Sequence, residues 1–285
     1  MFIELKDVSY TYLPGSQAAK EALGGVSLTL APGEFIALIG PTGSGKSTLV
    51  QILAGLLRPS SGRVLFEGSD IWQDHRRLPE RRRQVGLVFQ EPERQLFEMT
   101  VADDVAFWPR NAGVAPDRIG GMVEAALTAV GLDHKVYAGR SPFTLSGGEM
   151  RRVAIAGVLV MKPGVLLFDE PTSGLDHRGR VEITKRIKAL NEEGTAVVWV
   201  THDMDEVAEL AGRVILLDKG GIAADDTPRR LFQRRPLLAD IGLQSPQVTE
   251  MATMLARRGL PVDSLPMTLA EIEATVLAAL GKASA

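Results

Sequence analysis

The sequence predicts an α/β fold built around a largely parallel sheet that helices cover on both faces. Short apolar runs rich in Val, Ile and Leu recur along the chain, at residues 35–40, 85–90, 165–170, 196–202 and 213–218. Helical patterns separate several of these runs. Strands that are apolar along their whole length are typical of parallel sheets buried on both faces, in which ligands bind at the carboxyl ends of the strands.

The N-terminal segment MFIELKDVSYTY alternates like a strand. It lacks the basic-then-apolar layout of a secretory signal, so we expect the chain to begin as structure and not to be exported. The most apolar stretch, residues 153–168, is broken by Lys162, Pro163 and Gly164. It therefore falls short of the ~20 residues of a spanning helix, and we expect this chain not to cross a membrane alone.

Composition limits the classes of function. The 285 residues suffice for one large domain, or for one domain with a small appendage. The net charge of −3 leaves no overall basic field for nucleic acid or anionic lipid. The absence of cysteine excludes disulfides and thiolate metal sites and fits a reducing compartment such as the cytoplasm. The basic stretch 76–84 has no aromatic residues and is interrupted by Glu80, which favours a solvated helix face.

Residues 40–48, GPTGSGKST, fit the pattern G-x-x-x-x-G-K-[ST] directly after an apolar strand and before a helical pattern. A mere glycine-rich turn would not require both flanking elements. The pattern predicts a nucleoside triphosphate site in which the backbone surrounds the phosphates, Lys46 reaches the β and γ groups and Ser47 ligates Mg²⁺. The predicted binding residues are Gly40, Pro41, Thr42, Gly43, Ser44, Gly45, Lys46, Ser47 and Thr48.

A second candidate phosphate site lies inside the interval from about residue 91 to 160, which contains helical patterns without a convincing strand and predicts a helical subdomain. There, LSGGE at residues 145–149 opens a long helical pattern. We expect the amides of Ser146, Gly147 and Gly148 to be unpaired at the helix start, where the helix dipole favours an anion.

Two further strand ends carry candidate catalytic groups. The run 165–170 ends in Asp169 and Glu170, a costly pair to bury unless each has a partner or a task. Asp169 fits a position that holds Mg²⁺, and Glu170 fits a base that polarises the attacking water. His202 ends another strand, where a histidine is either structural or catalytic. The other three histidines show no metal-ligand spacing.

After about residue 236 the chain becomes two amphipathic pieces, residues 246–259 and 268–281. They predict a small helical C-terminal domain at residues 237–285, appended to a main domain at residues 1–236. One apolar stripe at helical spacing is predicted on the second piece, formed by Leu269, Ile272, Val276, Leu277 and Leu280.

Together these segments resemble the ATP-binding cassette (ABC) ATPases, from near the first residue to about residue 236. The resemblance implies a RecA-like mixed sheet with an antiparallel β subdomain and a helical subdomain. It also implies that Tyr12 stacks on adenine, that Gln90 senses magnesium and the membrane partner, and that SGLD at residues 173–176 forms the family's D-loop. The implied catalytic residues are Glu170, His202 and Lys46, the implied magnesium ligands are Ser47, Gln90 and Asp169, and the remaining implied nucleotide contacts are Ser146, Gly147, Gly148 and Asp176.

In this family two cassettes dimerise head to tail, so the resemblance implies that LSGGE caps the γ-phosphate held by a second ATPase subunit, either a copy of this chain or a paralogue. The usual last residue of this signature is Gln, whereas here it is Glu149. Because like charges repel, we expect Glu149 to face away from the phosphate and to pair with Arg152 three residues on.

A finer resemblance links residues 89–114, 145–163 and 169–180, together with the C-terminal tail, to the energy-coupling-factor ATPases, in particular to the second of their two paralogues. These ATPases drive vitamin and transition-metal-ion uptake. The resemblance implies a peripheral subunit at the cytoplasmic face of the cell membrane, with a transmembrane coupling protein and a substrate-binding membrane subunit as partners.

Two alternatives fit less well. A translation or DNA-repair cassette that acts on nucleic acid would have a second cassette or a long coiled coil, and this sequence has neither. A regulatory cassette that does not hydrolyse ATP would have a degenerate site, whereas Lys46, Asp169, Glu170 and His202 are all present. We therefore expect no nucleic-acid partner.

Overall fold

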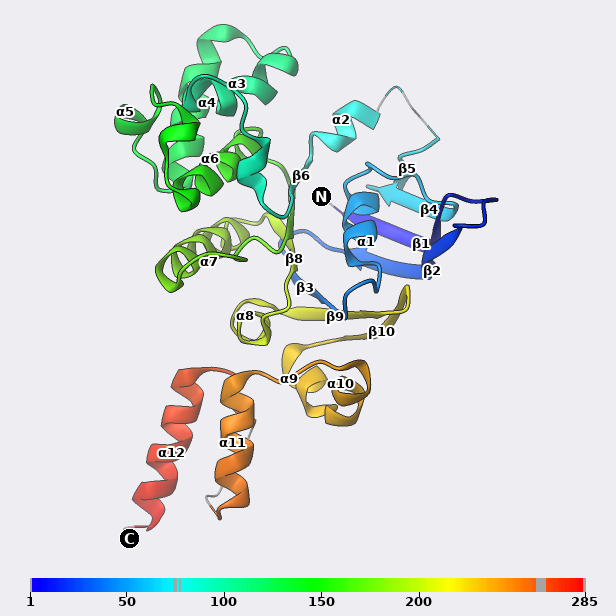
Figure 1. Cartoon of the computed structure of the whole chain (residues 1–285), viewed down its shortest axis with the longest axis vertical. Helices are drawn as coiled ribbons and strands as arrows, with labels where there is room; N and C mark the ends of the chain where they lie inside the picture. The colour runs from blue at the N-terminus through cyan, green and yellow to red at the C-terminus, as the bar shows by residue number, and fades with distance from the viewer. Residues whose placement is uncertain (1, 74–75, 77, 260–264, 284–285) are drawn as a thin grey trace.

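The structure, a computed structural model, describes residues 2–73, 76, 78–259 and 265–283, and only the backbone at residues 280–283. Figure 1 shows a central sheet between a small β region on one side and a group of helices on the other. A pair of C-terminal helices extends from the lower end of this view.

The central sheet is mixed, with strand order β10-β9-β3-β8-β7-β6. Every neighbouring pair from β9 to β6 is parallel, and only β10 runs antiparallel to its neighbour. The five apolar runs of the sequence are five of its strands, which confirms the predicted α/β core. The strands are β3 (Phe35–Ile39), β6 (Val85–Val88), β7 (Val165–Asp169), β8 (Ala196–Val200), β9 (Arg213–Asp218) and β10 (Gly221–Asp226).

The two faces of this sheet bury alternate residues of each strand, as the pleat requires. On β7, Val165 and Leu167 pack on one face, whereas Leu166 and Phe168 pack on the other. The first face is covered by α1 (Lys46–Leu53), and the second by α6 (Gly147–Leu159) and α7 (His177–Glu192). Helices on both faces explain why these strands are apolar throughout.

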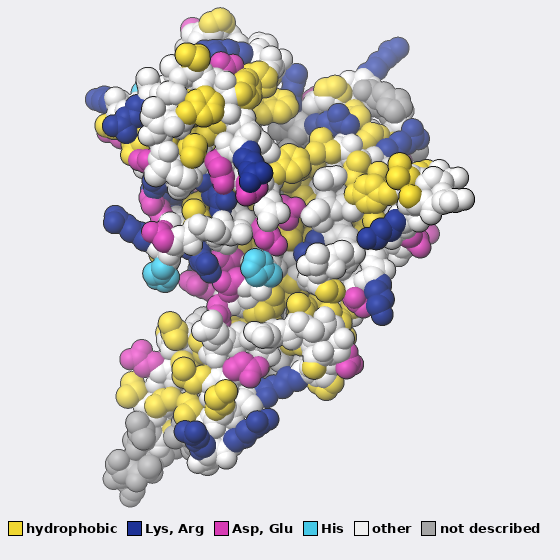
Figure 2. Space-filling view, in the orientation of Figure 1, with side chains coloured by type: hydrophobic (Ala, Val, Ile, Leu, Met, Phe, Trp, Pro, Cys, Tyr) yellow, Lys and Arg dark blue, Asp and Glu magenta, His cyan; other side chains and the backbone are white. Residues whose placement is uncertain are grey.

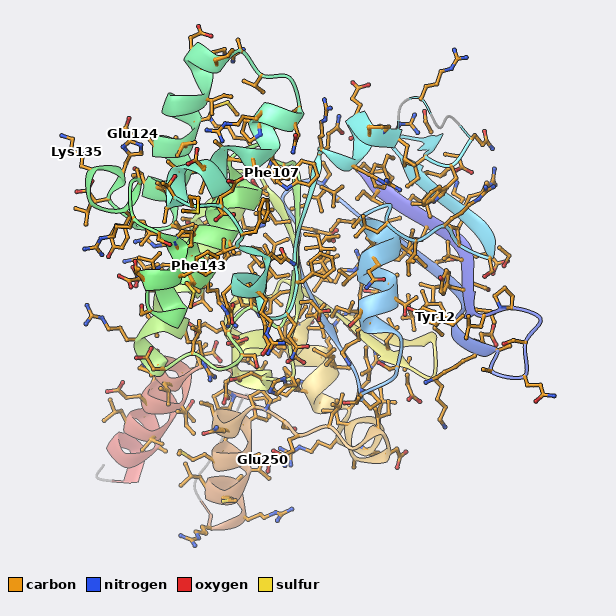
Figure 3. All side chains as sticks on the ribbon, turned by 45° about the horizontal axis from the view of Figure 1, so that its top comes forward. Tyr12, Phe107, Glu124, Lys135, Phe143 and Glu250 are labelled. Atoms are coloured by element: carbon orange, nitrogen blue, oxygen red, sulfur yellow. The ribbon has the colours of Figure 1, made fainter. Side chains whose placement is uncertain are left out.

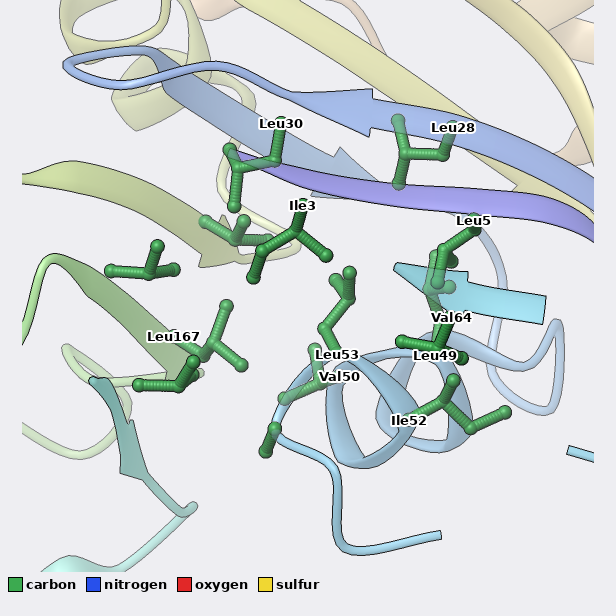
Figure 4. Packing of buried hydrophobic residues seen from close by; sticks show 14 of the residues in the cluster. Ile3, Leu5, Leu28, Leu30, Leu49, Val50, Ile52, Leu53, Val64 and Leu167 are labelled. Carbon is green, nitrogen blue, oxygen red and sulfur yellow. The ribbon is translucent and has the colours of Figure 1, made fainter. Parts of the chain in front are cut away.

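A four-stranded antiparallel sheet of order β2-β1-β4-β5 covers the outer side of α1. Its strands are β1 (Ile3–Tyr12), β2 (Lys20–Leu30), β4 (Ser61–Phe66) and β5 (Ser69–Asp70). Figure 4 shows Ile3 and Leu30 of this sheet facing the same core as Leu49 and Leu53 of α1. This packing fixes the position of α1 and therefore of the loop that precedes it.

Residues 91–160 form helices and no strand. They are α3 (Val101–Asn111), α4 (Pro116–Ala129), α5 (His134–Tyr137) and α6, with 3₁₀ turns at Pro92–Gln95 and Pro142–Thr144. The helix α6 lies directly on β6, because a Cβ atom at Gly86 would stand only 2.5 Å from Cγ1 of Val158. Glycine at this position of β6 lets the helix approach the sheet closely.

The basic stretch contains the short helix α2 (Leu78–Arg82) and is less solvated than predicted. Nη1 of Arg81 donates to the Asp70 carbonyl oxygen at 3.0 Å, and Nε of Arg82 donates to the Gly55 carbonyl oxygen at 2.8 Å. The prediction of a purely solvated face is wrong for these two residues, because their guanidinium groups satisfy backbone carbonyls of neighbouring segments.

The helix α8 (Met204–Leu210) follows β8. In the described C-terminal part, the helices are α9 (Pro228–Gln233), α10 (Arg235–Ile241), α11 (Gln247–Arg257) and α12 (Leu269–Ala283). Ile272 and Val276 of α12 pack against α11, as the predicted stripe requires. Leu269 and Leu277, however, are 74% and 62% exposed. Leu277 is five residues beyond Ile272 and so turns away from the face that α11 covers; the Leu280 side chain lies outside the described residues.

The apolar contacts cross the predicted boundary between residues 236 and 237. Leu238 of α10 and Met267 pack in the same cluster as Phe232 of α9 and Ile39 of β3. Within the described chain, no helix is both long and apolar enough to span a membrane.

Candidate functional site

The predicted phosphate loop, residues 40–48, runs from the end of β3 into α1, and two of its glycines are required by their surroundings. Gly40 has φ 148°, and a Cβ atom there would lie 2.1 Å from the Leu217 carbonyl oxygen. Gly45 has φ 105°, and its Cβ atom would lie 2.5 Å from the Ala22 carbonyl oxygen. Other residues would therefore push the loop off its supporting strands.

Lys46 is the first residue of α1, and its side chain folds back over the loop. Its Nζ atom donates to the carbonyl oxygens of Gly40 at 2.8 Å and Pro41 at 2.9 Å. Burial lowers the pKa of the Lys46 ammonium, and the negative charges of Glu170 and Asp169 oppose that shift. Two carbonyl acceptors and two nearby carboxyl groups thus hold a cation at the place where phosphates are expected.

Oxygen donors of the type that Mg²⁺ prefers converge beside Lys46. Burial raises the pKa of the Asp169 carboxyl, Glu170 adds to this rise, and a hydrogen bond from the Ser47 side chain opposes it. Asp169, Ser47 and Gln90 line one cleft. No cluster of three or more His, Cys, Asp or Glu side chains suited to a metal occurs among the described residues. A hydroxyl, an amide and one carboxylate fit Mg²⁺ that also binds substrate phosphates.

Glu170 follows β7 in a left-handed backbone conformation, with φ 50°, that non-glycine residues seldom adopt. Its amide donates to the Val200 carbonyl oxygen at 3.0 Å, so β8 holds it in place. His202, which follows β8, places Nδ1 3.4 Å from Oε1 of Glu170. The parallel pairing of β7 with β8 thus brings the two predicted catalytic side chains together at one sheet edge.

These groups share a first cleft of about 340 Å³. The predicted residues that line it are Tyr12, Thr42, Gly43, Gly45, Lys46, Ser47, Thr48, Gln90, Asp169 and Glu170. Gly40, Pro41 and Ser44 support the loop from outside this lining, and the His202 side chain is 74% exposed at its edge. The hydroxyl groups of Tyr12 and Thr48 lie 3.0 Å apart, and Figure 3 shows Tyr12 on the antiparallel-sheet side of the molecule.

Sequence reasoning missed Lys20 and Ala22, which also line the first cleft. Both lie on β2, and Lys20 is the cross-strand partner of Tyr12. A hairpin register of this kind, with several irregularities along β1 and β2, has no short sequence signal.

Ser146, Gly147, Gly148 and Asp176 do not join the first cleft. They line a second cleft of about 590 Å³ together with Arg152, Arg178 and Glu182. Among the residues that the structure describes, none lines both clefts. Asp176 accepts a hydrogen bond from the Gly179 amide at 2.8 Å and so caps α7. The second predicted phosphate segment is therefore separate from Lys46 within this chain.

The hydrogen bonds at the start of α6 contradict two predictions made from the sequence. The Ser146 amide is not unpaired, because it donates to Oε2 of Glu149 at 2.8 Å. Arg152 pairs with Glu182 at 2.7 Å, and Glu149 instead accepts from the Tyr137 hydroxyl at 2.7 Å. Hydrogen bonds from Ser146, and then from Tyr137, lower the pKa of Glu149 to about 2. Sequence reasoning missed the Ser-x-x-Glu spacing of a capping box at Ser146 and Glu149, and Tyr137 comes from another helix without a local signal.

Gly147 and Gly148 remain open to an external group. A Cβ atom at either position would meet nothing within 4 Å in the described chain, and neither residue has positive φ. Neither the backbone conformation nor the packing of these two residues therefore requires glycine. Both lie in the first turn of α6, where amides lack intrahelical partners, so the glycines leave room for an anion to approach the backbone.

The fold and the first cleft define a P-loop nucleoside triphosphatase. The family model described as "ABC transporter" matches residues 23–173. The chain belongs to the ABC transporter family, and it is an ATP-binding and ATP-hydrolysing member of it.

The relatives agree with this placement. The energy-coupling factor transporter ATP-binding protein EcfA2 of Clostridium tetani (strain Massachusetts / E88) is 43% identical over 278 residues, covering 97% of this chain and 96% of the relative. The structure of cbiO1 from Clostridium perfringens, part of the ABC transporter complex cbiONQ, superposes with a TM-score of 0.74 at 34% identity, covering 89% of this chain and 98% of that one. A dimeric structure of the cassette MJ0796 bound to ADP and Pi has a TM-score of 0.70 at 32% identity, with 80% and 99% covered.

Proposed function

We propose that this chain is the ATP-hydrolysing subunit of an energy-coupling-factor type importer, acting at the cytoplasmic face of the cell membrane. It powers uptake of a vitamin or a transition-metal ion through a transmembrane coupling protein, and a separate membrane subunit selects the substrate. The similarity to an energy-coupling factor transporter ATP-binding protein over 97% of this chain carries the importer assignment, and the division of phosphate-binding features between two clefts without a shared described lining residue carries the composite ATP site.

The separation of the clefts favours action in trans. The first cleft holds Lys46 and the candidate base Glu170, whereas Gly147 and Gly148 open the second. In a head-to-tail dimer, the glycines of one chain cap the γ-phosphate held by Lys46 of the other. The relative MJ0796 is a dimeric cassette, which supports this arrangement. The second ATPase is either a copy of this chain or a paralogue.

The residues of the first cleft support hydrolysis at the γ-phosphorus. Lys46 binds the β and γ phosphates, and Tyr12 stacks on the adenine. Glu170 accepts a proton from the attacking water while the bond between the γ-phosphorus and the bridging oxygen breaks, giving ADP and phosphate. Ser47, Gln90 and Asp169 would hold Mg²⁺, which would neutralise charge on the phosphate oxygens. His202, beside Glu170, orients the base and the phosphate.

An exposed apolar area supports a contact with the membrane partner in the helical region. Phe97 and Phe107 contact edge to face at 4.9 Å between ring centres, and Met99, two residues after Phe97, is 81% exposed. Figure 2 shows hydrophobic side chains gathered over the helical region. These residues follow Gln90 of the first cleft in the sequence, which supports a coupling between a partner bound here and the nucleotide site. Large exposed apolar areas mark protein or membrane contacts.

The proposal is tested by purifying the tagged chain from its native membrane and identifying the chains that accompany it. The expected result is a second ATPase or a self-dimer with two membrane proteins, and an assembly that takes up its substrate only with ATP. The isolated chain is expected not to bind protein-free lipid vesicles. Purification without membrane proteins, or tight binding to bare vesicles, would contradict the proposal.

A further inference from the structure

The carboxylate of Glu149 is held beside the second cleft and is not part of the described lining of that cleft. Ser146, Gly147, Gly148 and Arg152 line this cleft, whereas Glu149, which lies between them in sequence, is not among its described lining residues. Three donors hold the carboxylate: the Ser146 amide at 2.8 Å, the Ser146 hydroxyl at 2.7 Å and the Tyr137 hydroxyl at 2.7 Å. A negative charge thus stands beside the glycine residues while its donors keep it out of the described lining of the cleft.

Tyr137 is the donor that comes from outside the start of α6. It ends α5, and the Arg140 guanidinium lies over its ring at 5.2 Å from the centre. The hydrogen bond to Glu149 raises the pKa of the Tyr137 phenol, so the phenol stays protonated and able to donate at neutral pH. The two Ser146 donors belong to the same turn as Glu149 and hold its carboxylate locally, whereas Tyr137 ties the carboxylate to a different helix.

Without Tyr137 the carboxylate keeps only the two Ser146 bonds, and whenever it leaves them it would compete with the phosphate. The amides of Gly147 and Gly148 and the dipole of α6 attract any nearby negative charge, including that of Glu149 itself. If the side chain turned toward the cleft, it would repel a bound phosphate and occupy the same amides. A tyrosine that holds the carboxylate against α5 prevents both effects.

We infer that Tyr137 is a positioning residue for ATP hydrolysis: by holding the Glu149 carboxylate against α5, it leaves the amides of Gly147 and Gly148 to the γ-phosphate of the partner subunit. The inference rests on the proposed function, because it requires that the second cleft bind a phosphate carried by another chain. Tyr137 acts through Glu149 and does not touch the phosphate.

The test measures KM for ATP and kcat in the assembly that purifies with the chain. Tyr137→Phe should raise KM by about threefold to tenfold, the effect of one like charge released at a partly screened distance. It should leave kcat within about twofold, because a change in binding alone appears in KM. The increase in KM should shrink as salt is added, since salt screens a repulsion between exposed charges.

The second variant separates positioning from a structural role. Glu149→Gln keeps the shape of the side chain and removes its charge, so it should not raise KM, and Tyr137→Phe added to it should have no further effect on KM. A matched control is Thr144→Val, which removes the hydrogen bond from Thr144 to the Ser141 carbonyl oxygen in the same loop without touching Glu149. It should leave KM unchanged.

The outcomes are decisive in either direction. An unchanged KM for Tyr137→Phe, an equal increase in both backgrounds, or a raised KM for Glu149→Gln alone would overturn the inference. A wild-type assembly without ATP hydrolysis, or one whose activity does not depend on a second ATPase chain, would instead refute the proposed function.

Discussion

Glu170 combines three features at the scale of one residue: a left-handed backbone, a position at the end of a buried strand and a histidine 3.4 Å from its carboxylate. Strained backbone of this kind persists only where surrounding structure holds it, here through the bond from its amide to the Val200 carbonyl oxygen. Backbone strain lowers stability locally, and it fits a residue whose carboxylate must point in one direction for catalysis.

Glu170→Gln should retain ATP binding and slow hydrolysis by roughly 10² to 10⁴ fold, because the amide cannot accept the proton of the attacking water. Steady-state phosphate release measures the rate, and size-exclusion chromatography with ATP should show an accumulated dimer. Glu192→Gln, at the exposed end of α7, is the matched control and should hydrolyse ATP normally. Near-normal turnover of Glu170→Gln would show that Glu170 is not the general base.

At the scale of the element, α6 is anchored by Arg151, whose side chain is only 5% exposed. Its guanidinium pairs with both carboxylate oxygens of Glu93 at 3.2 Å and donates to the carbonyl oxygens of Pro171 and Ser173. One buried side chain thereby fixes α6 to the turn after Gln90 and to the segment that follows Glu170.

Arg151→Met should lower the free energy of unfolding by roughly 2 to 4 kcal/mol, because it leaves Glu93 and two carbonyl oxygens without their partner. Because Glu93 keeps some contact with solvent, the expected loss in the free energy of unfolding lies at or below the usual range for a broken buried ion pair. Urea unfolding followed by circular dichroism measures the change. Arg118→Met, on the exposed surface of α4, should change stability little, and equal losses for both variants would contradict the argument.

At the scale of the whole molecule, one chain carries the phosphate loop of one composite site and the signature glycines of another. Lys46→Ala should disable the chain's own loop, whereas Ser146→Arg should block the site of its neighbour. In a homodimer, one chain of each kind leaves one composite site intact and one doubly damaged, so mixing two inactive preparations should restore part of the ATPase activity.

For a heterodimer the same substitutions are divided between the paralogues. Lys46→Ala here, together with the signature substitution in the partner, damages one site only, whereas both substitutions in one chain damage two sites. ATPase activity of these defined pairs, after dimerisation is confirmed by size, is the measurement. Equal losses in every pairing would mean that the clefts do not meet across an interface.

The sequence by itself determined the features that short, contiguous patterns encode. The apolar runs predicted five strands of the central sheet, and GPTGSGKST predicted the loop between β3 and α1, because strand, turn and helix preferences act over a few residues. The opening of α6 by Ser146, Gly147 and Gly148 was likewise predicted, because LSGGE stands directly before a helical pattern.

The tertiary structure alone decided which distant groups meet. Lys20 reaches the first cleft through the register of β1 and β2, Tyr137 reaches Glu149 from another helix, and Leu277 is exposed because α11 covers a narrower face of α12 than the apolar spacing indicates. Such contacts depend on how helices and strands pack against each other. Because this packing is set by apolar burial over the whole chain, a short segment of sequence carries no signal for the distant residue that it will contact.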